Sequence, residues 1–199
     1  MAPVVVDPSR VRTFDSAEAF ETWLSDHHDR EPEVWVRMFK KASGHASVDW
    51  AQAVPVALCW GWIDGQRKGL DAVSFLQRFT PRGAKSSWSE INVAHAERLI
   101  AEGRMQEPGR VQIEAAKADG RWAKTYRVKG AEVPDDLMAA IRAEPAALAV
   151  FETLTSQNRF ALIFRTQQMR TAAGRAKKIA SLVEMLARGE TPHPQKATP

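Results

Sequence analysis

The stretch from Leu58 to Asn92, LCWGWIDGQRKGLDAVSFLQRFTPRGAKSSWSEIN, says more about the fold than any other part of this 199-residue chain. Glycine and aspartate separate runs of apolar, β-branched and aromatic residues there, which is typical of strands joined by turns. We expect strand ends around a turn at 62–65 and 69–71. A further strand is predicted from Val73 to Phe79, where Pro81 would end it.

Outside that stretch the pattern is mostly helical. A capping box at Asp15 and Glu18 predicts a helix to about His28. The run Val34–Phe39 predicts a strand, and Asp49 is expected to cap a helix that Pro55 kinks or delays by one turn. Further predictions are a helix at 90–102 capped by Ser89, helices at 108–118, 134–143 and 145–155, one capped by Ser156, one around 179–186, and a short strand at 126–128.

The order of these segments predicts an α+β fold. Its small antiparallel or mixed sheet would lie in about the first 130 residues, packed by helices, and the C-terminal third would be all helical. The length suits one domain, or one domain with a helical appendage. We divide the chain into an N-terminal extension at 1–13, an α+β core at 14–130, a helical part of the same domain or a subdomain at 131–190, and a disordered tail at 191–199.

Composition bounds the class of protein. Apolar residues make up 44% of the chain and charged residues 26%, which are values of a globular protein rather than a disordered one. The single cysteine, Cys59, rules out a disulfide within the chain, and its apolar neighbours favour a small buried side chain. The start lacks the pattern of a signal peptide, and no apolar run is long enough to span a membrane, so we expect a cytoplasmic location.

The net charge of +4 is unevenly distributed. Residues 1–152 hold 20 Lys and Arg against 22 Asp and Glu, whereas residues 153–199 hold 8 against 2. The basic C-terminal quarter is interpreted first as a solvated face, and otherwise as a contact for nucleic acid, anionic lipid or an acidic protein. Few aromatic residues lie among its cations, which argues against nucleic acid. The cations concerned are Arg159, Arg165, Arg170, Arg175, Lys177 and Lys178.

Tryptophan, glycine and arginine cluster in the central stretch. Arginine suits carboxylates and phosphates, tryptophan offers a flat apolar wall, and glycine allows close approach. A helix N-terminus near Ser89 would add backbone N–H groups for an anion. Composition alone slightly favours an aromatic core with surface ion pairs over a ligand pocket. The candidate ligand-binding residues are Trp62, Asp64, Arg78, Arg82, Ser87, Trp88, Asn92, Arg121 and Trp122.

Asp64 and Asp71 are the candidate catalytic residues, because two carboxylates can perform acid–base chemistry. An aspartate next to glycine more often forms a turn, so the structural interpretation is preferred. The histidines are scattered without the spacing of metal ligands, and no phosphate-binding loop or dinucleotide motif is present. We therefore expect no metal and no cofactor.

A longer string of residues forms a pattern found in a known family. Its members are Ala57–Gly65, Leu70–Asp71, Arg78–Arg82, Ser86, Trp88, Ser89, Asn92, Ala96–Ile100, Gly103–Met105, Gly109, Asp119–Trp122 and Pro134–Leu137. This string resembles the YdeI/OmpD-associated family of bacterial proteins, also called the bacteriocin-protection family, and the resemblance extends from about Phe14 to Pro192. It implies a role in envelope stress, with tolerance of cationic peptides or bacteriocins, and association with an outer-membrane porin; it implies no catalytic mechanism.

Three functions follow as hypotheses. The preferred one is a stress-associated cytoplasmic protein with a pocket for a small anionic or aromatic ligand, with a protein partner as a further expectation. The second is an enzyme that acts on a small anionic metabolite through Asp64 or Asp71 and an arginine clamp. The third is nucleic-acid binding through the basic C-terminal helices. The oligomeric state stays open.

Overall fold

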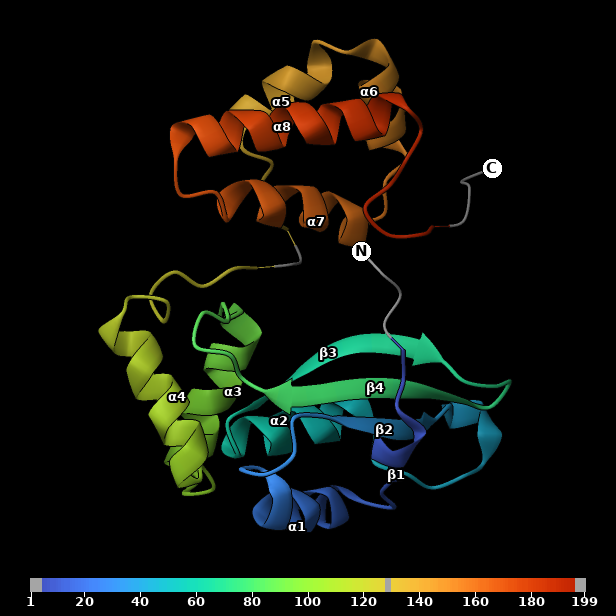
Figure 1. Ribbon diagram of the computed structural model, residues 1–199, viewed down its shortest axis with the longest axis vertical. Coiled ribbons are helices and arrows are strands. Elements are labelled where there is room, and N and C mark those ends of the chain that lie inside the picture. The colour runs from blue at the N-terminus through green and yellow to red at the C-terminus, as the bar shows by residue number, and fades with distance from the viewer. Residues whose placement is uncertain (1–4, 128–129, 196–199) are drawn as a thin grey trace. The chain divides into compact units, whose positions relative to one another are not determined.

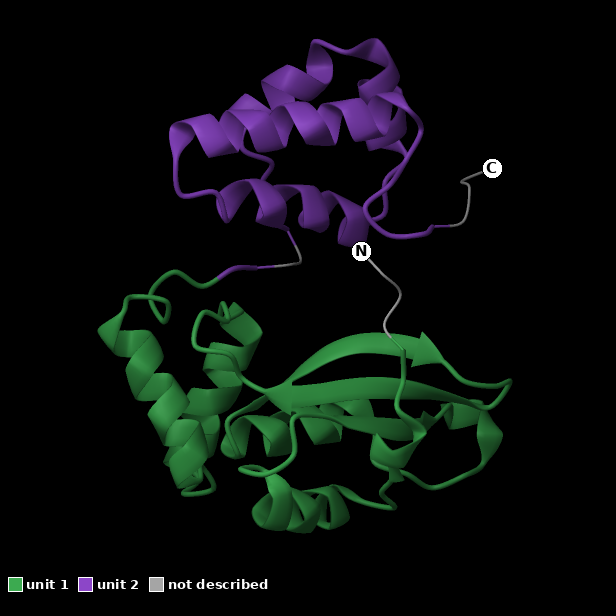
Figure 2. Cartoon of the chain, in the orientation of Figure 1, with its two compact units in different colours: residues 1–125 green, residues 126–199 purple. Residues whose placement is uncertain are grey.

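A computed structural model describes residues 5–127 and 130–195 and divides the chain into two compact units, residues 1–125 and 126–199 (Figure 2). Unit 1 contains a four-stranded mixed sheet with helices, and the described part of unit 2 contains helices without strands. The predicted α+β class with a helical C-terminal third is confirmed. In the part of the chain that the structure describes, every helix is too short or too polar to span a bilayer.

The sheet of unit 1 has the strand order β1-β2-β4-β3 (Figure 1). Its strands are β1 (Val11–Thr13), β2 (Val34–Phe39), β3 (Trp62–Gly69) and β4 (Ser74–Pro81). β1 runs parallel to β2, and the other two pairs are antiparallel. Residues 1–13 were predicted to be an extension, but β1 forms one edge of the sheet. A strand of three residues is too short to show a hydrophobic pattern in the sequence, and its pairing partner β2 lies far along the chain.

The β3–β4 hairpin occupies most of the stretch from Leu58 to Asn92. Trp62 pairs with Pro81 at one end and Gly69 with Phe75 at the other, with an irregularity between Asp64 and Arg67. β4 extends to Pro81, beyond the predicted end at Phe79, because a proline at a strand end loses no essential hydrogen bond.

The described residues of unit 1 form the helices α1 (Ala17–His27), α2 (Trp50–Cys59), α3 (Glu90–Ala101) and α4 (Glu107–Ala118), with short 3-10 turns at Pro8–Arg10 and Lys41–Ser43. The cap predictions at Asp49 and Ser89 are confirmed. The cap of α1 is Ser16 rather than Asp15, since the Ser16 hydroxyl accepts from Ala19 N at 3.3 Å.

Pro55 neither delays nor ends α2, which begins at Trp50 and continues to Cys59. The capping box of Asp49 and Gln52 fixes its first turn, and burial of the helix from Ala53 onward holds the rest. Packing has therefore overridden the local cost of a proline without a backbone N–H.

The core of unit 1 lies between the sheet and helices α1 and α2, which cover one face of the sheet (Figure 1). α4 crosses the end of α2 at a very short distance. A Cβ atom on Gly109 would lie 2.5 Å from the carbonyl oxygen of Cys59, and one on Gly61 would lie 2.8 Å from that of Pro108. Gly61 also has a φ of +71°, so both positions require glycine. The largest fully buried side chains of this core include Phe20, Leu24, Met38, Trp62, Phe79, Trp88, Leu99 and Ile113.

Unit 2 is built from α5 (Asp135–Arg142), α6 (Pro145–Glu152), α7 (Ser156–Gln167) and α8 (Ala172–Ala187). Its core is aliphatic, with one phenylalanine: Leu137, Ile141, Ala147, Phe151, Leu154, Leu162, Ile179, Leu182 and Leu186. The cap of α7 is Thr155 and not Ser156, because the Thr155 hydroxyl accepts from Asn158 N. Of the strand predicted at 126–128, Tyr126 forms only an isolated β-bridge, Arg127 is not in a strand, and Val128 lies outside the described residues.

The tail was predicted to be disordered from residue 191, but the segment up to Gln195 is held against α7. The buried Asn158 side chain donates to His193 O at 3.0 Å and to Gln195 Oε1 at 2.7 Å. It also accepts from His193 N at 2.8 Å. One buried amide thus anchors a segment whose composition alone suggested disorder; residues 196–199 lie outside the described residues.

Candidate functional site

Three of the predicted ligand-binding residues are engaged separately in unit 1. Trp62 is 1% exposed, and its Nε1 donates to the carbonyl oxygen of His28 at 3.1 Å. Asp64 accepts from Trp50 Nε1 at 3.1 Å. Arg78 forms a two-pronged ion pair with Glu33, at 2.5 and 2.6 Å. These side chains serve the core and the surface of the sheet through partners of their own.

Five of the other six predicted residues gather at the loop before α3, in what we call the Arg82–Trp88 cluster: Arg82, Ser87, Trp88, Arg121 and Trp122. Arg82 is 4% exposed and its guanidinium lies 3.7 Å from the centre of the Trp88 ring. The Trp88 ring packs against Trp122 at 4.8 Å. Asn92 lies nearby in sequence, at the start of α3, where its backbone N donates to Ser89 Oγ.

Both arginines of the cluster bind the chain itself. Arg82 Nη1 donates to Ser87 O at 3.0 Å, and Arg121 Nη1 donates to Ser86 O at 2.9 Å. Asp119 holds Arg121 from the other side at 2.7 Å. The cluster therefore fixes the loop at 86–89 by two charge-assisted hydrogen bonds. That is a structural role, whereas its ligand-binding role stays a prediction.

Replacing Arg121 with methionine tests which role prevails. We expect the free energy of unfolding to fall by about 1–2 kcal/mol, because a charge-assisted bond to a carbonyl is lost. Lys124→Met, at an exposed position nearby, is the control. Urea unfolding measures both. The opposite result would be that the variant is as stable as the wild type without phosphate, and that phosphate stabilises only the wild type. In that case the cluster binds an anion, and its role is not to fix the loop.

The candidate catalytic carboxylates have structural partners. Asp71 Oδ1 accepts from the backbone N atoms of Val73 and Ser74 and from the Ser74 hydroxyl, and its Oδ2 accepts from Arg37 at 2.8 Å. The hydrogen bond from Ser74 is the main cause that lowers the pKa of Asp71. A general acid needs a raised pKa, so this geometry is that of a turn.

Cys59 is fully buried, and burial raises the pKa of its thiol to about 11. It is protonated at neutral pH and unsuited to nucleophilic chemistry. Within residues 5–127 and 130–195, no three His, Cys, Asp or Glu side chains are placed to hold a metal ion.

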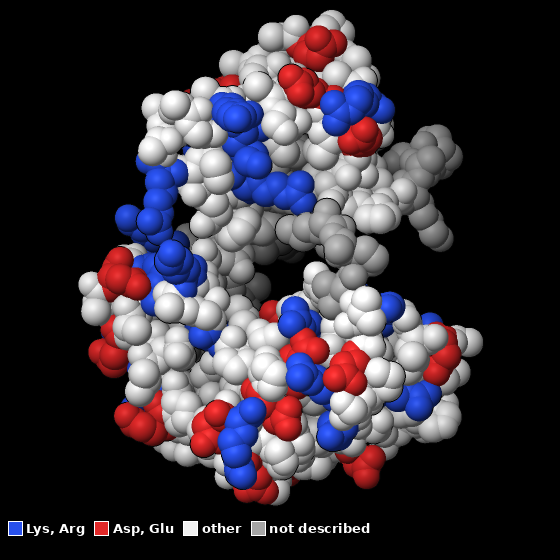
Figure 3. All heavy atoms as spheres, viewed as in Figure 1, with Lys and Arg blue, Asp and Glu red and all other residues white. Residues whose placement is uncertain are grey.

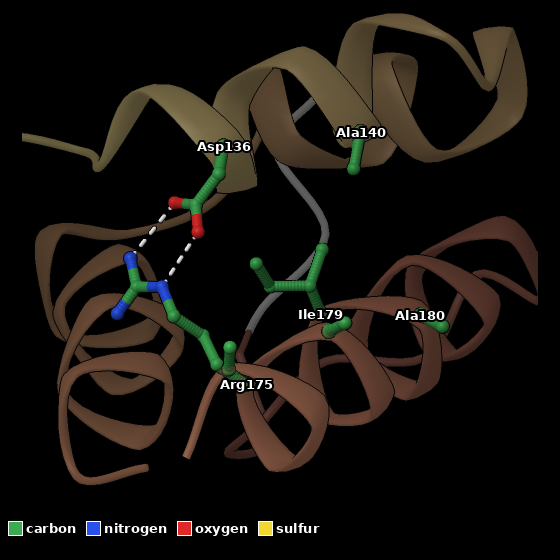
Figure 4. Close-up of a pocket in the computed structure, with 7 residues that line it drawn as sticks. Asp136, Ala140, Arg175, Ile179 and Ala180 are labelled. Carbon is green, nitrogen blue, oxygen red and sulfur yellow. Dashed lines mark hydrogen bonds and ion pairs between the residues drawn. The ribbon is translucent and has the colours of Figure 1, made fainter. Parts of the chain in front are cut away.

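Unit 2 contains a recess that the sequence analysis missed. It lies between α5 and α8, has a volume of about 480 Å³, and is closed at one end by an ion pair of Arg175 and Asp136 (Figure 4). Arg175 donates to both carboxylate oxygens, at 2.5 and 2.8 Å, and to Thr166 O at 3.2 Å. One side chain thereby ties α5, α7 and α8 together. The other residues that line the recess are Ala140, Ala172, Ala176, Ile179 and Ala180.

The pair of Arg175 and Asp136 gives unit 2 a pH dependence. The hydrogen bond from Arg175 lowers the pKa of Asp136 below its ordinary value of 3.8. A lowered pKa means that the stabilisation is fully present above pH 3.8 and is lost as the pH falls through the folded-state pKa. We expect Asp136→Asn to lower the thermal midpoint of unit 2 at pH 7 and to weaken its decline in acid.

The control for that prediction is Asp135→Asn, in the same helical turn, where no ion pair exists among the described residues. Thermal unfolding followed by circular dichroism between pH 2 and 7 compares the three proteins. An Asp136 variant whose acid profile overlays that of the wild type would show that the pair contributes nothing to stability.

Six of the basic residues of unit 2 lie on α7, on α8 and between them. Residues 153–183 hold six Lys and Arg and no Asp or Glu. Arg175 is neutralised by Asp136, and Arg159 donates to Glu152 O. The remaining four form what we call the basic surface of unit 2, and they have no acidic partner among the described residues: Arg165, Arg170, Lys177 and Lys178.

The two units differ in charge. Unit 1 holds 17 Lys and Arg against 17 Asp and Glu, and unit 2 holds 11 against 7, so the whole net charge of +4 belongs to unit 2. In Figure 3, Lys and Arg side chains (blue) lie over the half of unit 2 that contains α7 and the start of α8, and Asp and Glu side chains (red) lie toward the C-terminal end of α8. The predicted basic quarter is therefore a concentrated surface.

Two family models match this chain. "Domain of unknown function (DUF8412)" matches residues 12–112, and "Bacteriocin-protection, YdeI or OmpD-Associated" matches residues 130–189. The chain belongs to the DUF8412 family, whose match covers about half of it, and residues 130–189 are similar to the YdeI/OmpD-associated family. No curated protein and no solved structure matches it.

The predicted resemblance to the YdeI/OmpD-associated family is confirmed for residues 130–189, a shorter segment than the one expected. Most of the motif string quoted for the resemblance lies at 57–112, within the DUF8412 match. The YdeI/OmpD-associated match instead covers α5 to α8. Both the recess and the basic surface therefore lie in the segment that is similar to the YdeI/OmpD-associated family.

Proposed function

We propose that this protein is a cytoplasmic, stress-associated binding protein of bacteriocin protection, and that unit 2 holds an anionic partner on its basic surface. The family description supports the protective role. The observation that carries the binding role is the run of six cations without an acidic residue at 153–183. Four of these cations lack an acidic partner among the described residues, so they are available to a partner.

The placement of charge on α8 supports an anionic partner. The N-terminus of a helix carries a partial positive charge, so acidic residues stabilise it and basic ones do not. The first turn of α8 has no acidic residue, and Arg175, Lys177 and Lys178 follow within its first two turns. A bound anion would therefore be attracted both by the helix end and by Lys177 and Lys178.

The same surface argues against direct capture of a cationic peptide, which it would repel. The protective role is then exercised through an anionic component rather than by sequestering a cationic bacteriocin on unit 2. The small-ligand site predicted in unit 1 is a weaker candidate, because its two arginines already donate to backbone carbonyls.

Fluorescence anisotropy of the full chain with labelled polyglutamate and with a labelled single-stranded oligonucleotide tests the proposal. Binding of either probe should weaken with salt. If four cations engage the oligonucleotide, log K should fall against log salt with a slope of about −3. The two probes distinguish a carboxylate-rich partner from a phosphate-rich one. Absence of binding to both at low salt, or binding that is indifferent to salt, overturns the proposal.

A further inference from the structure

We infer that the turn of the β3–β4 hairpin is a contact for a membrane surface of anionic phospholipid. This turn, residues 70–73, which we call the hairpin tip, lies at the opposite end of unit 1 from α3 and α4 (Figure 1). Leu70 is 49% exposed and Val73 38%, whereas most large apolar side chains of unit 1 are buried. Because the tip is convex, these two side chains can enter the outer layer of a bilayer and leave water.

Positive charge surrounds the hairpin tip. Lys40, at the end of β2, lies beside the turn, because its backbone N donates to Val73 O and its Nζ to Ala72 O, both at 2.8 Å. Arg67 and Lys68 come just before the turn and are consecutive in β3, so their side chains leave opposite faces of the sheet. Cations therefore flank the apolar turn from the neighbouring strand and from both faces of the hairpin.

The charge around the tip is strongly one-sided. The segments 37–48 and 65–75 hold five Lys and Arg against one acidic residue, Asp71, which gives a net charge of +4. The Asp71 carboxylate accepts from Ser74 N and forms an ion pair with Arg37 at 2.8 Å, so its charge is already matched within the sheet. An anionic surface at the tip is therefore attracted rather than repelled. The other four cations are exposed and have no acidic partner among the described residues: Lys40, Lys41, Arg67 and Lys68.

The combination of aliphatic side chains and cations favours a lipid surface over other anionic partners. Leu70 and Val73 cannot stack on bases as aromatic side chains do, which argues against single-stranded nucleic acid. A convex turn also cannot enclose a small anion. In a bilayer, the two apolar side chains enter the boundary of the acyl chains while the lysine ammonium groups stay at the phosphates. This inference does not rest on the anionic partner proposed for unit 2.

Cosedimentation of the full chain with lipid vesicles tests the contact. Vesicles that contain phosphatidylglycerol should bind the chain at low salt, and vesicles of phosphatidylcholine alone should not. Leu70→Ser combined with Val73→Ser should weaken binding roughly tenfold or more, because the side chains that leave water are lost. The matched control is Ile91→Ser combined with Val111→Ser, on α3 and α4, where the side chains are 60% and 54% exposed. This control should bind as the wild type does.

The cations of the tip are tested separately. Lys41→Gln combined with Lys68→Gln should weaken vesicle binding about 25-fold, since each lysine near an anionic membrane contributes about fivefold. The same variant should bind polyglutamate as the wild type does, because the basic surface of unit 2 is intact. Failure of this inference is thus distinguishable from failure of the proposed anionic partner. Circular dichroism of each variant checks that the fold is retained.

A fluorophore at the tip shows whether the turn itself enters the bilayer. Cys59 is fully buried, so a Leu70→Cys variant can be labelled with an environment-sensitive dye at position 70 alone. Its emission should shift to the blue with phosphatidylglycerol vesicles, whereas a label introduced by Ile91→Cys should not respond. A dye at 70 that stays in water, or vesicle binding that the two apolar double variants reduce equally, overturns the inference. So does a Lys41 and Lys68 variant that loses oligonucleotide binding and keeps vesicle binding.

Discussion

Replacing Gly109 with alanine is expected to lower the free energy of unfolding of unit 1 by about 3 kcal/mol, the upper part of the range for overpacking. The new Cβ would lie 2.5 Å from Cys59 O and 2.7 Å from Leu58 O, which are backbone atoms that cannot rotate away. Alanine would gain about 1 kcal/mol of helix propensity in α4. The clash is larger, so α4 must shift away from the end of α2.

Gly103→Ala is the matched control. Gly103 has a φ of +69°, but no atom lies within 4 Å of its would-be Cβ. Its substitution should cost only about 1–2 kcal/mol, from backbone strain alone. Urea unfolding followed by tryptophan fluorescence separates the two variants. Equal destabilisation would mean that the close approach of α2 and α4 is not what requires glycine at 109.

The second large effect concerns the basic surface. Changing its four cations together to glutamine should abolish the salt dependence of polyanion binding and reduce the affinity at low salt by roughly 100-fold or more. Each lost contact with the polyanion removes about one unit from the slope of log K against log salt concentration. The fold should persist, because none of the four has an acidic partner in the described structure. Anisotropy with the labelled polyanions measures the change.

A control variant removes the same charge from unit 1. Lys41, Lys68, Lys85 and Lys124 are all exposed, and their change to glutamine alters the net charge equally. This variant should bind as the wild type does. If both variants lose affinity together, net charge rather than the basic surface explains the binding.

Local signals predicted much of the fold. The capping residues Asp49 and Ser89 and the apolar run of β2 act over a few residues, so the sequence shows them directly. β1 was not predicted, because its three residues form a strand only by pairing with β2, more than 20 residues away in the sequence. The delayed start predicted for α2 was wrong, because burial of the helix outweighed the local cost of Pro55.

The candidate site was harder to predict because neighbours in sequence need not share a surface. Trp62, at the start of β3, points into the core, while Asp64 and Arg78 take separate partners. Side chains alternate across a strand, so Arg78 lies on the face of β4 opposite that of the buried Phe79. The recess of unit 2 joins Ala140 to Ala176 and Ala180, and only the packing of α5 on α8 brings these residues together. The spacing of the alanines at 172, 176 and 180 was the available signal.

The most direct test of the binding role is an NMR titration of the full chain, labelled with ¹⁵N, with polyglutamate. Amide shifts should concentrate at Arg165, Arg170, Lys177 and Lys178 and saturate, while the amides of Trp88 and Arg121 stay unchanged. Shifts centred on the Arg82–Trp88 cluster, or no saturable shift in unit 2, would contradict the proposal that the basic surface holds the anionic partner.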